Sequence, residues 1–198
     1  MVAQKQNVIV FGGAFSPPTL AHEALLRECL ALPGFDEVWL LPSGNRTDKH
    51  ISVTHAHQLA MLGILRDELS GNGNRLRIDT TEVERTLSTE TDDTYRELTT
   101  KYPAVSFRFV YGADSYETIR TWQNGSWLAS HLPVLIAPRN GAALPKPNSY
   151  IEILQSLPLE LQHISSTAAR AALERGEDVT AFVSPAIAQY ISSHNLFV

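Results

Sequence analysis

The sequence predicts an α/β fold, built on a doubly wound and mainly parallel sheet with helices on both faces. Short apolar runs alternate along the chain with segments of helical periodicity, which is the pattern of consecutive right-handed strand–helix–strand units. Most of the apolar runs are hydrophobic at nearly every position, as expected for strands that are covered on both faces. Neither an internal repeat nor a break in composition divides the chain, so we expect a single Rossmann-like domain over residues 1–198.

The individual elements follow from these runs in chain order. Strands are expected at residues 7–11, 37–42, 75–79, 106–112, 133–138 and 161–164. Helices are expected at about 19–31, 54–69, 92–101, 115–121, 149–156, 167–175 and 184–194. A parallel sheet of this kind binds ligands beyond the carboxyl ends of its strands, near the point where the strand order reverses. The loop after the first strand is therefore the first place to look for a ligand site.

Length and composition describe an ordinary globular protein of 198 residues, 43% hydrophobic and 19% charged. The net charge is −5 and no run of Lys or Arg is present, which argues against sequence-independent binding to nucleic acid. No apolar stretch has the length of a signal peptide core or a membrane span, so we expect no membrane partner and a cytoplasmic location. Cys29 is the only cysteine, which excludes internal disulfides and Cys-rich zinc sites.

The segment GGAFSPPTLAH, residues 12–22, connects the first expected strand to the first expected helix. Gly12 and Gly13 let the backbone turn sharply and approach a ligand with no Cβ in the way. Thr19 is a candidate N-cap, and His22 then lies in the first turn, beside unpaired backbone N–H groups and the positive end of the helix dipole. This combination predicts an anion site for phosphate. The alternative is a plain connection with a surface histidine, since the patterns G-x-x-x-x-G-K-[ST], G-x-G-x-x-G and G-x-S-x-G are absent.

A second helix beginning with the same chemistry occurs near the C-terminus, in ISSTAAR, residues 164–170. Ser165, Ser166 and Thr167 offer hydroxyl groups together with the N–H groups of a helix start. Arg170 lies in the first turn, where its planar guanidinium can reach the same anion. The alternative interpretation is a helix cap followed by a surface arginine.

Both segments resemble the signatures of nucleotidyltransferases of the H-x-G-H or T-x-G-H type, and most of all those of the nicotinate-nucleotide adenylyltransferases. GGAFSPPTLAH is similar to G-G-x-F-D-P-x-H-x-G-H, with Ser16, Thr19 and Ala21 in place of the usual Asp, first His and Gly. ISSTAAR is similar to I-S-S-T-x-x-R, which clasps the ATP phosphates in that family. The resemblance implies transfer of AMP from ATP to nicotinate mononucleotide, giving deamido-NAD and pyrophosphate, with Mg²⁺ carried by ATP.

The resemblance also assigns roles to individual residues, and no metal held by the protein itself is expected. The catalytic residues would be His22, Thr19 and Arg170. The residues that bind ATP and its phosphates would be Gly12, Gly13, Phe15, Ser165, Ser166, Thr167, Arg170 and Lys49. The residues at the mononucleotide would be Thr91, Asp114, Trp122 and Arg139.

Three of these assignments have a plain structural alternative. Asp114 follows a buried strand, where its carboxylate would accept hydrogen bonds from ribose hydroxyls, or would only cap a helix. Trp122 would stack on the pyridine ring, or would only fill the core. Lys49, with Arg46 and His50, would meet phosphate or lie in a solvated loop.

Two other functions stay open at this point. The first is a transferase of the same fold that uses nicotinamide mononucleotide or another phosphorylated acceptor, because Glu90 stands where the family has Tyr and the loop at 46–50 is altered. The second is a nucleotide-binding sensor without catalysis, which only the departures at Ser16, Thr19 and Ala21 support. The expected partners are ATP and a pyridine mononucleotide, and self-association is left open.

Overall fold

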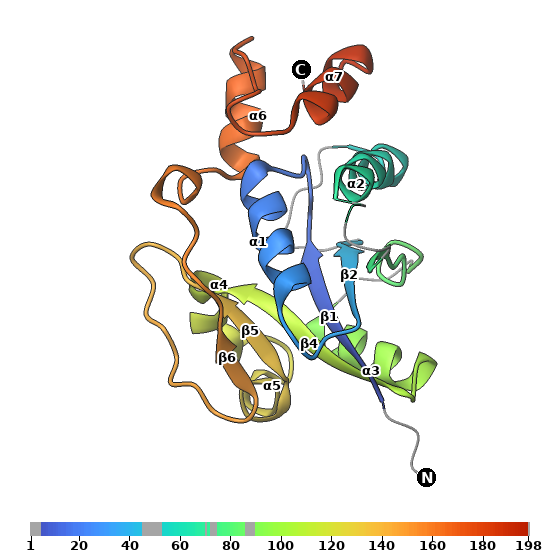
Figure 1. Ribbon diagram of the computed structural model, residues 1–198, viewed down its shortest axis with the longest axis vertical. Coiled ribbons are helices and arrows are strands. Elements are labelled where there is room, and N and C mark those ends of the chain that lie inside the picture. The colour runs from blue at the N-terminus through green and yellow to red at the C-terminus, as the bar shows by residue number, and fades with distance from the viewer. Residues whose placement is uncertain (1–4, 45–52, 70, 72–74, 86–89, 198) are drawn as a thin grey trace.

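A six-stranded sheet forms the centre of the computed structural model, which describes residues 5–44, 53–69, 71, 75–85 and 90–197 (Figure 1). Its strands are β1 (Gln6–Gly13), β2 (Glu37–Pro42), β3 (Leu76–Ile78), β4 (Val105–Gly112), β5 (Val134–Ala137) and β6 (Ile151–Ile153). They pair in parallel in the order β3-β2-β1-β4-β5-β6. The order reverses between the central strands β1 and β4, so the sheet is doubly wound and Rossmann-like, as predicted.

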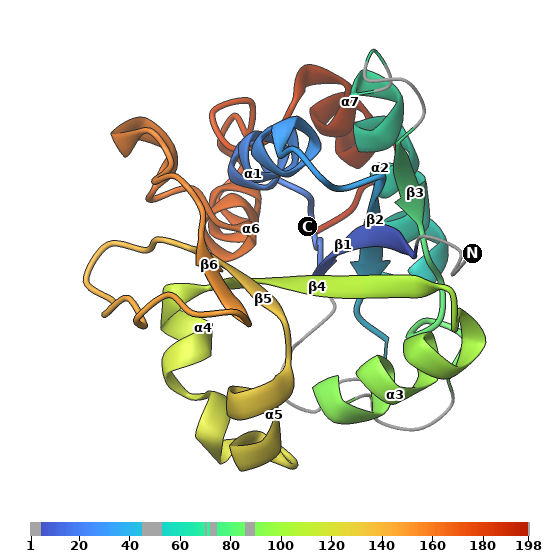
Figure 2. The same cartoon turned by 60° about the horizontal axis from the view of Figure 1, so that its bottom comes forward.

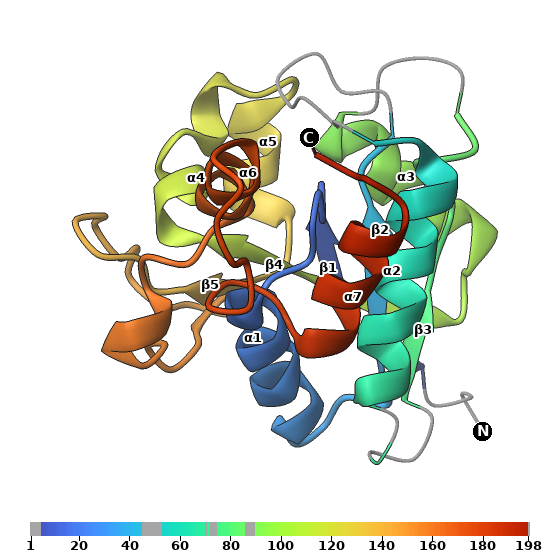
Figure 3. The ribbon, with the colours of Figure 1, turned by 90° about the horizontal axis from the view of Figure 1, so that it is seen from above.

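Two layers of helices cover the sheet, and Figure 2 shows one layer on each side of it. The first layer contains α1 (Leu20–Ala31), α2 (His55–Glu68), α6 (Ser166–Glu174) and α7 (Pro185–Ser193). The second contains α3 (Thr91–Lys101), α4 (Ala113–Glu117) and α5 (Gly125–His131), with the short 3₁₀ helix η2 (Ile119–Thr121). In the view from above, α7 lies beside α2 (Figure 3).

The side chains of β1 explain why its sequence is apolar at every position. Successive residues of a strand point to opposite faces of the sheet. Ile9 and Phe11 pack into the core under α1 and α2, whereas Val8 and Val10 pack into the core on the side of α3 to α5. All four are buried, which confirms that this run is a strand covered on both faces.

Two predictions near the C-terminus are wrong. The segment at 149–156 contains the edge strand β6 and no helix. No strand forms at 161–164, where Leu161 ends the short 3₁₀ helix η3 (Leu159–Leu161) and irregular structure leads to α6. The apolar spacing of 151–157 is compatible with either period, and pairing with β5 decides the outcome. Ile164 is buried against the α1 side of the core from a turn, so an apolar residue there did not require a strand.

The region after β4 also differs from the sequence prediction. The helix expected at 115–121 is divided into α4 and η2, and α5 follows it without having been indicated by the sequence. Gly125, the first residue of α5, lies so close to the backbone of η2 that a Cβ there would be 2.2 Å from the carbonyl oxygen of Ile119. Among the described residues, no helix combines the length and apolar character needed to cross a bilayer.

Candidate active site

A cleft with a volume of about 310 Å³ opens at the carboxyl ends of β1, β2, β4 and β5. One wall is formed by the loop after β1, the first turn of α1 and the beginning of α6. The opposite wall is formed by the first turn of α3, the end of β4 and the beginning of α4. The cleft therefore lies where a doubly wound sheet is expected to bind its ligand.

Most of the residues singled out from the sequence line this cleft. Arg170 and Trp122 lie outside its lining, and Lys49, like Arg46 and His50, lies outside the described residues. The residues that line it are Gly12, Gly13, Phe15, Thr19, His22, Thr91, Asp114, Arg139, Ser165, Ser166 and Thr167.

His22 is held at the cleft by the N-cap of its own helix. The backbone N–H of Thr19 donates to His22 Nδ1 at 3.0 Å, and Thr19 Oγ1 lies 2.8 Å from the same nitrogen. Because a backbone N–H can only donate, Nδ1 carries a lone pair and the neutral ring has its proton on Nε2. The ring also packs against Phe15 and Phe11, with centroids 5.1 and 6.0 Å away. These contacts fix both the tautomer and the direction of the imidazole.

The beginning of α6 is joined to the loop after β1. Ser166 Oγ donates to the Pro17 carbonyl at 2.8 Å, and Arg170 Nη1 donates to the Ser16 carbonyl at 2.7 Å. Arg170 Nη2 also lies 3.3 Å from Thr167 Oγ1. The two helix beginnings, far apart in the sequence, thus share one cleft, with the Arg170 guanidinium beside it rather than in its lining.

Asp114 stands at the carboxyl end of β4, on the opposite wall, with its side chain exposed to the cleft. A Cβ on Gly112 would lie 2.3 Å from Asp114 Oδ1 and 3.3 Å from Arg139 Nε, so a larger residue here would make the Asp114 carboxylate move from its present position. Thr91, in the first turn of α3, places its Oγ1 3.3 Å from the Tyr111 hydroxyl. This wall offers a carboxylate, a hydroxyl and a guanidinium to a ligand.

Trp122 lies one layer behind the cleft. Its ring meets the ring of Tyr111 edge-on, with centroids 5.2 Å apart, and its Nε1 donates to Thr118 Oγ1 at 3.1 Å. Tyr111 itself lines the cleft. Glu90 is the N-cap residue of α3 and does not line the cleft.

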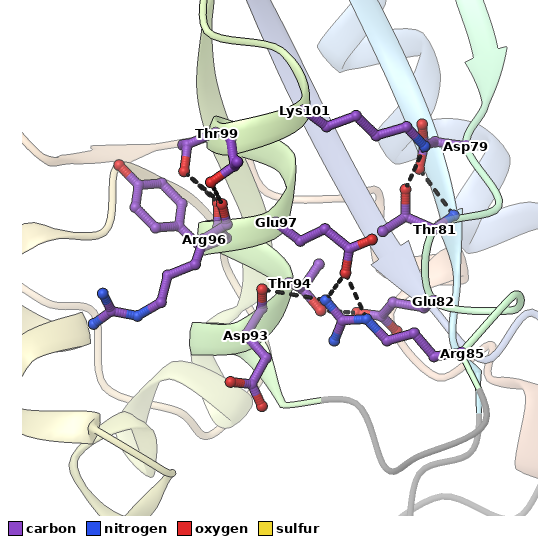
Figure 4. Close-up of polar contacts among 12 residues, drawn as sticks. Asp79, Thr81, Glu82, Arg85, Asp93, Thr94, Arg96, Glu97, Thr99 and Lys101 are labelled. Atoms are coloured by element: carbon purple, nitrogen blue, oxygen red, sulfur yellow. Dashed lines mark hydrogen bonds and ion pairs between the residues drawn. The ribbon is translucent and has the colours of Figure 1, made fainter.

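The sequence did not indicate Glu82, whose carboxylate is bonded to Thr94 in the same wall. Thr94 Oγ1, on α3, donates to Glu82 Oε1 at 2.8 Å, and both side chains are buried and line the cleft (Figure 4). Nearby, Arg85 Nε donates to Glu97 Oε2 at 2.7 Å, which ties α3 to the segment after β3 (Figure 4). The signal that would have found Glu82 is its place just beyond the carboxyl end of β3.

The titratable groups in the described part of the chain do not form a metal centre. No group of three or more His, Cys, Asp or Glu side chains among these residues is arranged to hold a metal ion. Away from the cleft, burial raises the pKa of the Cys29 thiol to about 12.

Comparison with known proteins agrees with the two motifs. The family model described as Cytidylyltransferase-like matches residues 10–172. A protein of Bordetella petrii named "Probable nicotinate-nucleotide adenylyltransferase" is 30% identical over 202 residues, covering 97% of this chain and 99% of the relative. A protein of the same name from Albidiferax ferrireducens is 29% identical over 198 residues, covering 97% and 98%.

Among solved structures, one titled "Plasmodium falciparum nicotinic acid mononucleotide adenylyltransferase complexed with NaAD" superposes with a TM-score of 0.85 at 25% identity, covering 97% of each chain. The fold and nearly the full length of the chain therefore agree with one group of enzymes. This chain belongs to the cytidylyltransferase-like family, and within it to the nicotinate-nucleotide adenylyltransferases.

Proposed function

We propose that this enzyme transfers the AMP moiety of ATP to nicotinate mononucleotide and releases deamido-NAD and pyrophosphate. The observation that carries the proposal is the single cleft in which the first turn of α1 and the beginning of α6 meet. Relatives along the whole chain carry the name of this activity, which supports the same conclusion.

The wall formed by α1 and α6 suits the triphosphate. Backbone N–H groups at a helix beginning have no partner within the helix and lie at the positive end of its dipole, so they attract anions. At α6 this applies to the N–H groups of Ser166 and Thr167, whereas at α1 the Leu20 N–H, expected from the sequence to be unpaired, donates to the Phe182 carbonyl at 2.8 Å. His22, with its proton on Nε2, adds a donor to the same wall, and the Thr167 hydroxyl adds another. Arg170 would turn from the Ser16 carbonyl to the β- or γ-phosphate.

The opposite wall suits the parts of the substrates that donate hydrogen bonds. The carboxylate of Asp114 would accept from ribose hydroxyls, and Thr91 would border the mononucleotide. Trp122 would support the pyridine ring indirectly, by packing against Tyr111, or would itself stack on the ring after a change of rotamer that displaces Tyr111. Arg139 would offset the charge of the acceptor phosphate.

The reaction requires alignment and charge stabilisation rather than a nucleophile from the protein. The acceptor phosphate, already ionised at neutral pH, attacks the α-phosphorus of ATP. A new phosphorus–oxygen bond forms while the bond to the β-phosphate oxygen breaks, and pyrophosphate leaves in line. His22 and the helix N–H groups stabilise the charge on the phosphate oxygens.

Mg²⁺ enters with ATP as part of the substrate, coordinated by phosphate oxygens and water. We place the reaction in the cytoplasm.

A pyrophosphate-release assay with ATP, Mg²⁺ and one mononucleotide at a time tests the proposal. We expect rapid release with nicotinate mononucleotide and much slower release with nicotinamide mononucleotide. Preference for the amide or for another phosphorylated acceptor would replace the proposed substrate. ATP binding without release from any acceptor would contradict the proposed catalysis. Glu90 does not belong to the cleft lining, so the departure from the family at this position gives no argument against the acid.

A further inference from the structure

Gln58 is a fully buried polar side chain that the proposed reaction does not use. It lies on α2 with 0% exposure, behind the cleft rather than in its lining. Its Nε2 donates to the Ala14 carbonyl at 2.6 Å and lies 3.4 Å from the Ser43 carbonyl. Ala14 follows β1, Ser43 follows β2, and both line the cleft. One side-chain amide therefore joins two of the backbone segments that shape the cleft.

The Ala14 and Ser43 carbonyls, which can only accept, determine that the nitrogen end of this amide faces them. His55 Nδ1 lies 3.1 Å from Gln58 Oε1, an atom that can only accept, so Nδ1 is the donor. The amide nitrogen, which can only donate, then points at the carbonyl oxygens of Ala14 and Ser43. Both polar atoms of the amide are paired, which offsets the cost of burying them.

The residue after Ala14 has an unusual backbone conformation. Phe15 has a φ of +44°, in the left-handed region that residues other than glycine rarely adopt. Such a conformation persists only where several surrounding contacts enforce it. The buried Phe15 ring provides one, by packing against His22 and Phe11, and the bond from Gln58 to the preceding carbonyl provides another.

That bond also sets the direction of an N–H group at the cleft. In a trans peptide the C=O and the N–H point in opposite directions. Because the Ala14 carbonyl is turned toward Gln58, the Phe15 N–H is turned away from Gln58. Ala14 and Phe15 line the cleft and Gln58 does not, so the direction away from Gln58 is the one assigned here to the ligand. A rotated peptide would present a carbonyl oxygen to the ligand instead, and this oxygen would repel a phosphate.

We infer that Gln58 is a positioning residue for phosphate recognition, holding the peptide between Ala14 and Phe15 so that its N–H faces the triphosphate. The inference rests on the proposed function, because it takes a triphosphate as the ligand of this wall. It assigns a specific task to a residue that never touches the substrate.

Calorimetric titration of ATP with Mg²⁺ into two variants tests the inference. Gln58→Met keeps the length of the side chain and removes its donor, while Gln58→Glu keeps the shape and sets an oxygen against the Ala14 carbonyl. We expect the affinity for ATP to fall about ten- to hundredfold, the range for a lost hydrogen bond to a charged group, and to fall further in Gln58→Glu. The matched control is Asn7→Asp, which removes an amide donor to the Gly34 carbonyl (3.0 Å) at the opposite end of β1. It should leave ATP affinity unchanged.

A purely structural role for Gln58 would lower the Tm of its variants without changing the affinity of the folded protein. ATP affinities within about twofold of wild type in both variants, or an equal loss in Asn7→Asp, would overturn the inference. The titration needs no acceptor, so its outcome is separate from that of the proposed reaction. Wild-type protein that binds ATP but releases no pyrophosphate would refute the reaction alone, and Gln58 would still be judged by the affinities.

Discussion

Replacement of His22 by alanine should remove most of the turnover and leave the fold intact. In the wild type, the neutral ring presents its protonated Nε2 while Nδ1 accepts from the Thr19 N–H. Removing one donor that stabilises charge in the transition state costs about 10²- to 10³-fold in kcat, or about 3–4 kcal/mol. We therefore expect kcat for pyrophosphate release to fall by that factor, with a smaller change in KM for the mononucleotide.

The effect of the same change on stability should be much smaller. The alanine variant loses the cap contact to the Thr19 N–H, which is worth about 1 kcal/mol, and part of the packing on Phe15. A typical domain has an unfolding free energy of about 5–15 kcal/mol, so the variant should remain folded. Circular dichroism and a melting curve check this before any kinetic comparison.

The matched control for His22→Ala is His131→Ala. His131 is exposed on α5, and its Nδ1 is bonded to the carbonyl of Trp127 within the same helix. Its replacement should leave kcat unchanged, because it does not line the cleft. If folded His22→Ala turned over within about threefold of the wild type, the proposed role of the imidazole would have to be abandoned.

Three further changes follow from the same structure. Arg170→Ala should raise KM for ATP about tenfold or more, which is the scale of a lost hydrogen bond to a charged group. Arg170→Lys should recover little of this loss, because lysine lacks the planar guanidinium fork. Steady-state kinetics at varied ATP concentration would show both effects. Ser16→Ala should keep or raise Tm in a thermal melt, since Ser16 Oγ is buried without a partner among the described residues, and a clear drop would contradict that account. Cys29 should not react with a thiol reagent at about pH 8 until the protein unfolds, because burial raises the pKa of its thiol to about 12 and so suppresses the reactive thiolate. Rapid labelling of the native protein would contradict this expectation.

Local signals in the sequence were sufficient for the elements that carry the site. The apolar run of β1, the glycine pair after it and the capping residues Thr19 and Ser165 each have a physical meaning that needs no distant contact. The beginnings of α1 and α6 were therefore predicted within a residue. Their meeting in one cleft was implied by the family resemblance and not by the strand rule, because residues 161–164 form no strand and α6 therefore does not directly follow a strand of the sheet.

The elements and residues that were missed depend on contacts between distant parts of the chain. β6 is a strand because it pairs with the edge of β5, and its own sequence is equally compatible with a helix. The pairing of Thr94 with Glu82 and the bond from Gln58 to Ala14 join segments that no spacing rule connects. The place of Trp122 behind Tyr111 is likewise set by packing between two side chains.

At two of the three departures from the family signature, Ser16 and Thr19, backbone atoms make contacts to the residues of the site. Ser16 contributes its carbonyl to Arg170, and the side chain takes no part in that bond. Thr19 holds His22 through its N–H, which any residue except proline supplies at that position, and its hydroxyl adds a second contact. Ala21 is buried beside the cleft and presents only a methyl group to it. The Thr19 N–H holds His22 and the Ser16 carbonyl holds Arg170, so neither contact requires the side chain that the family signature has there, and Ala21 adds only a methyl group. The three substitutions are therefore compatible with an active enzyme and do not support a sensor without catalysis.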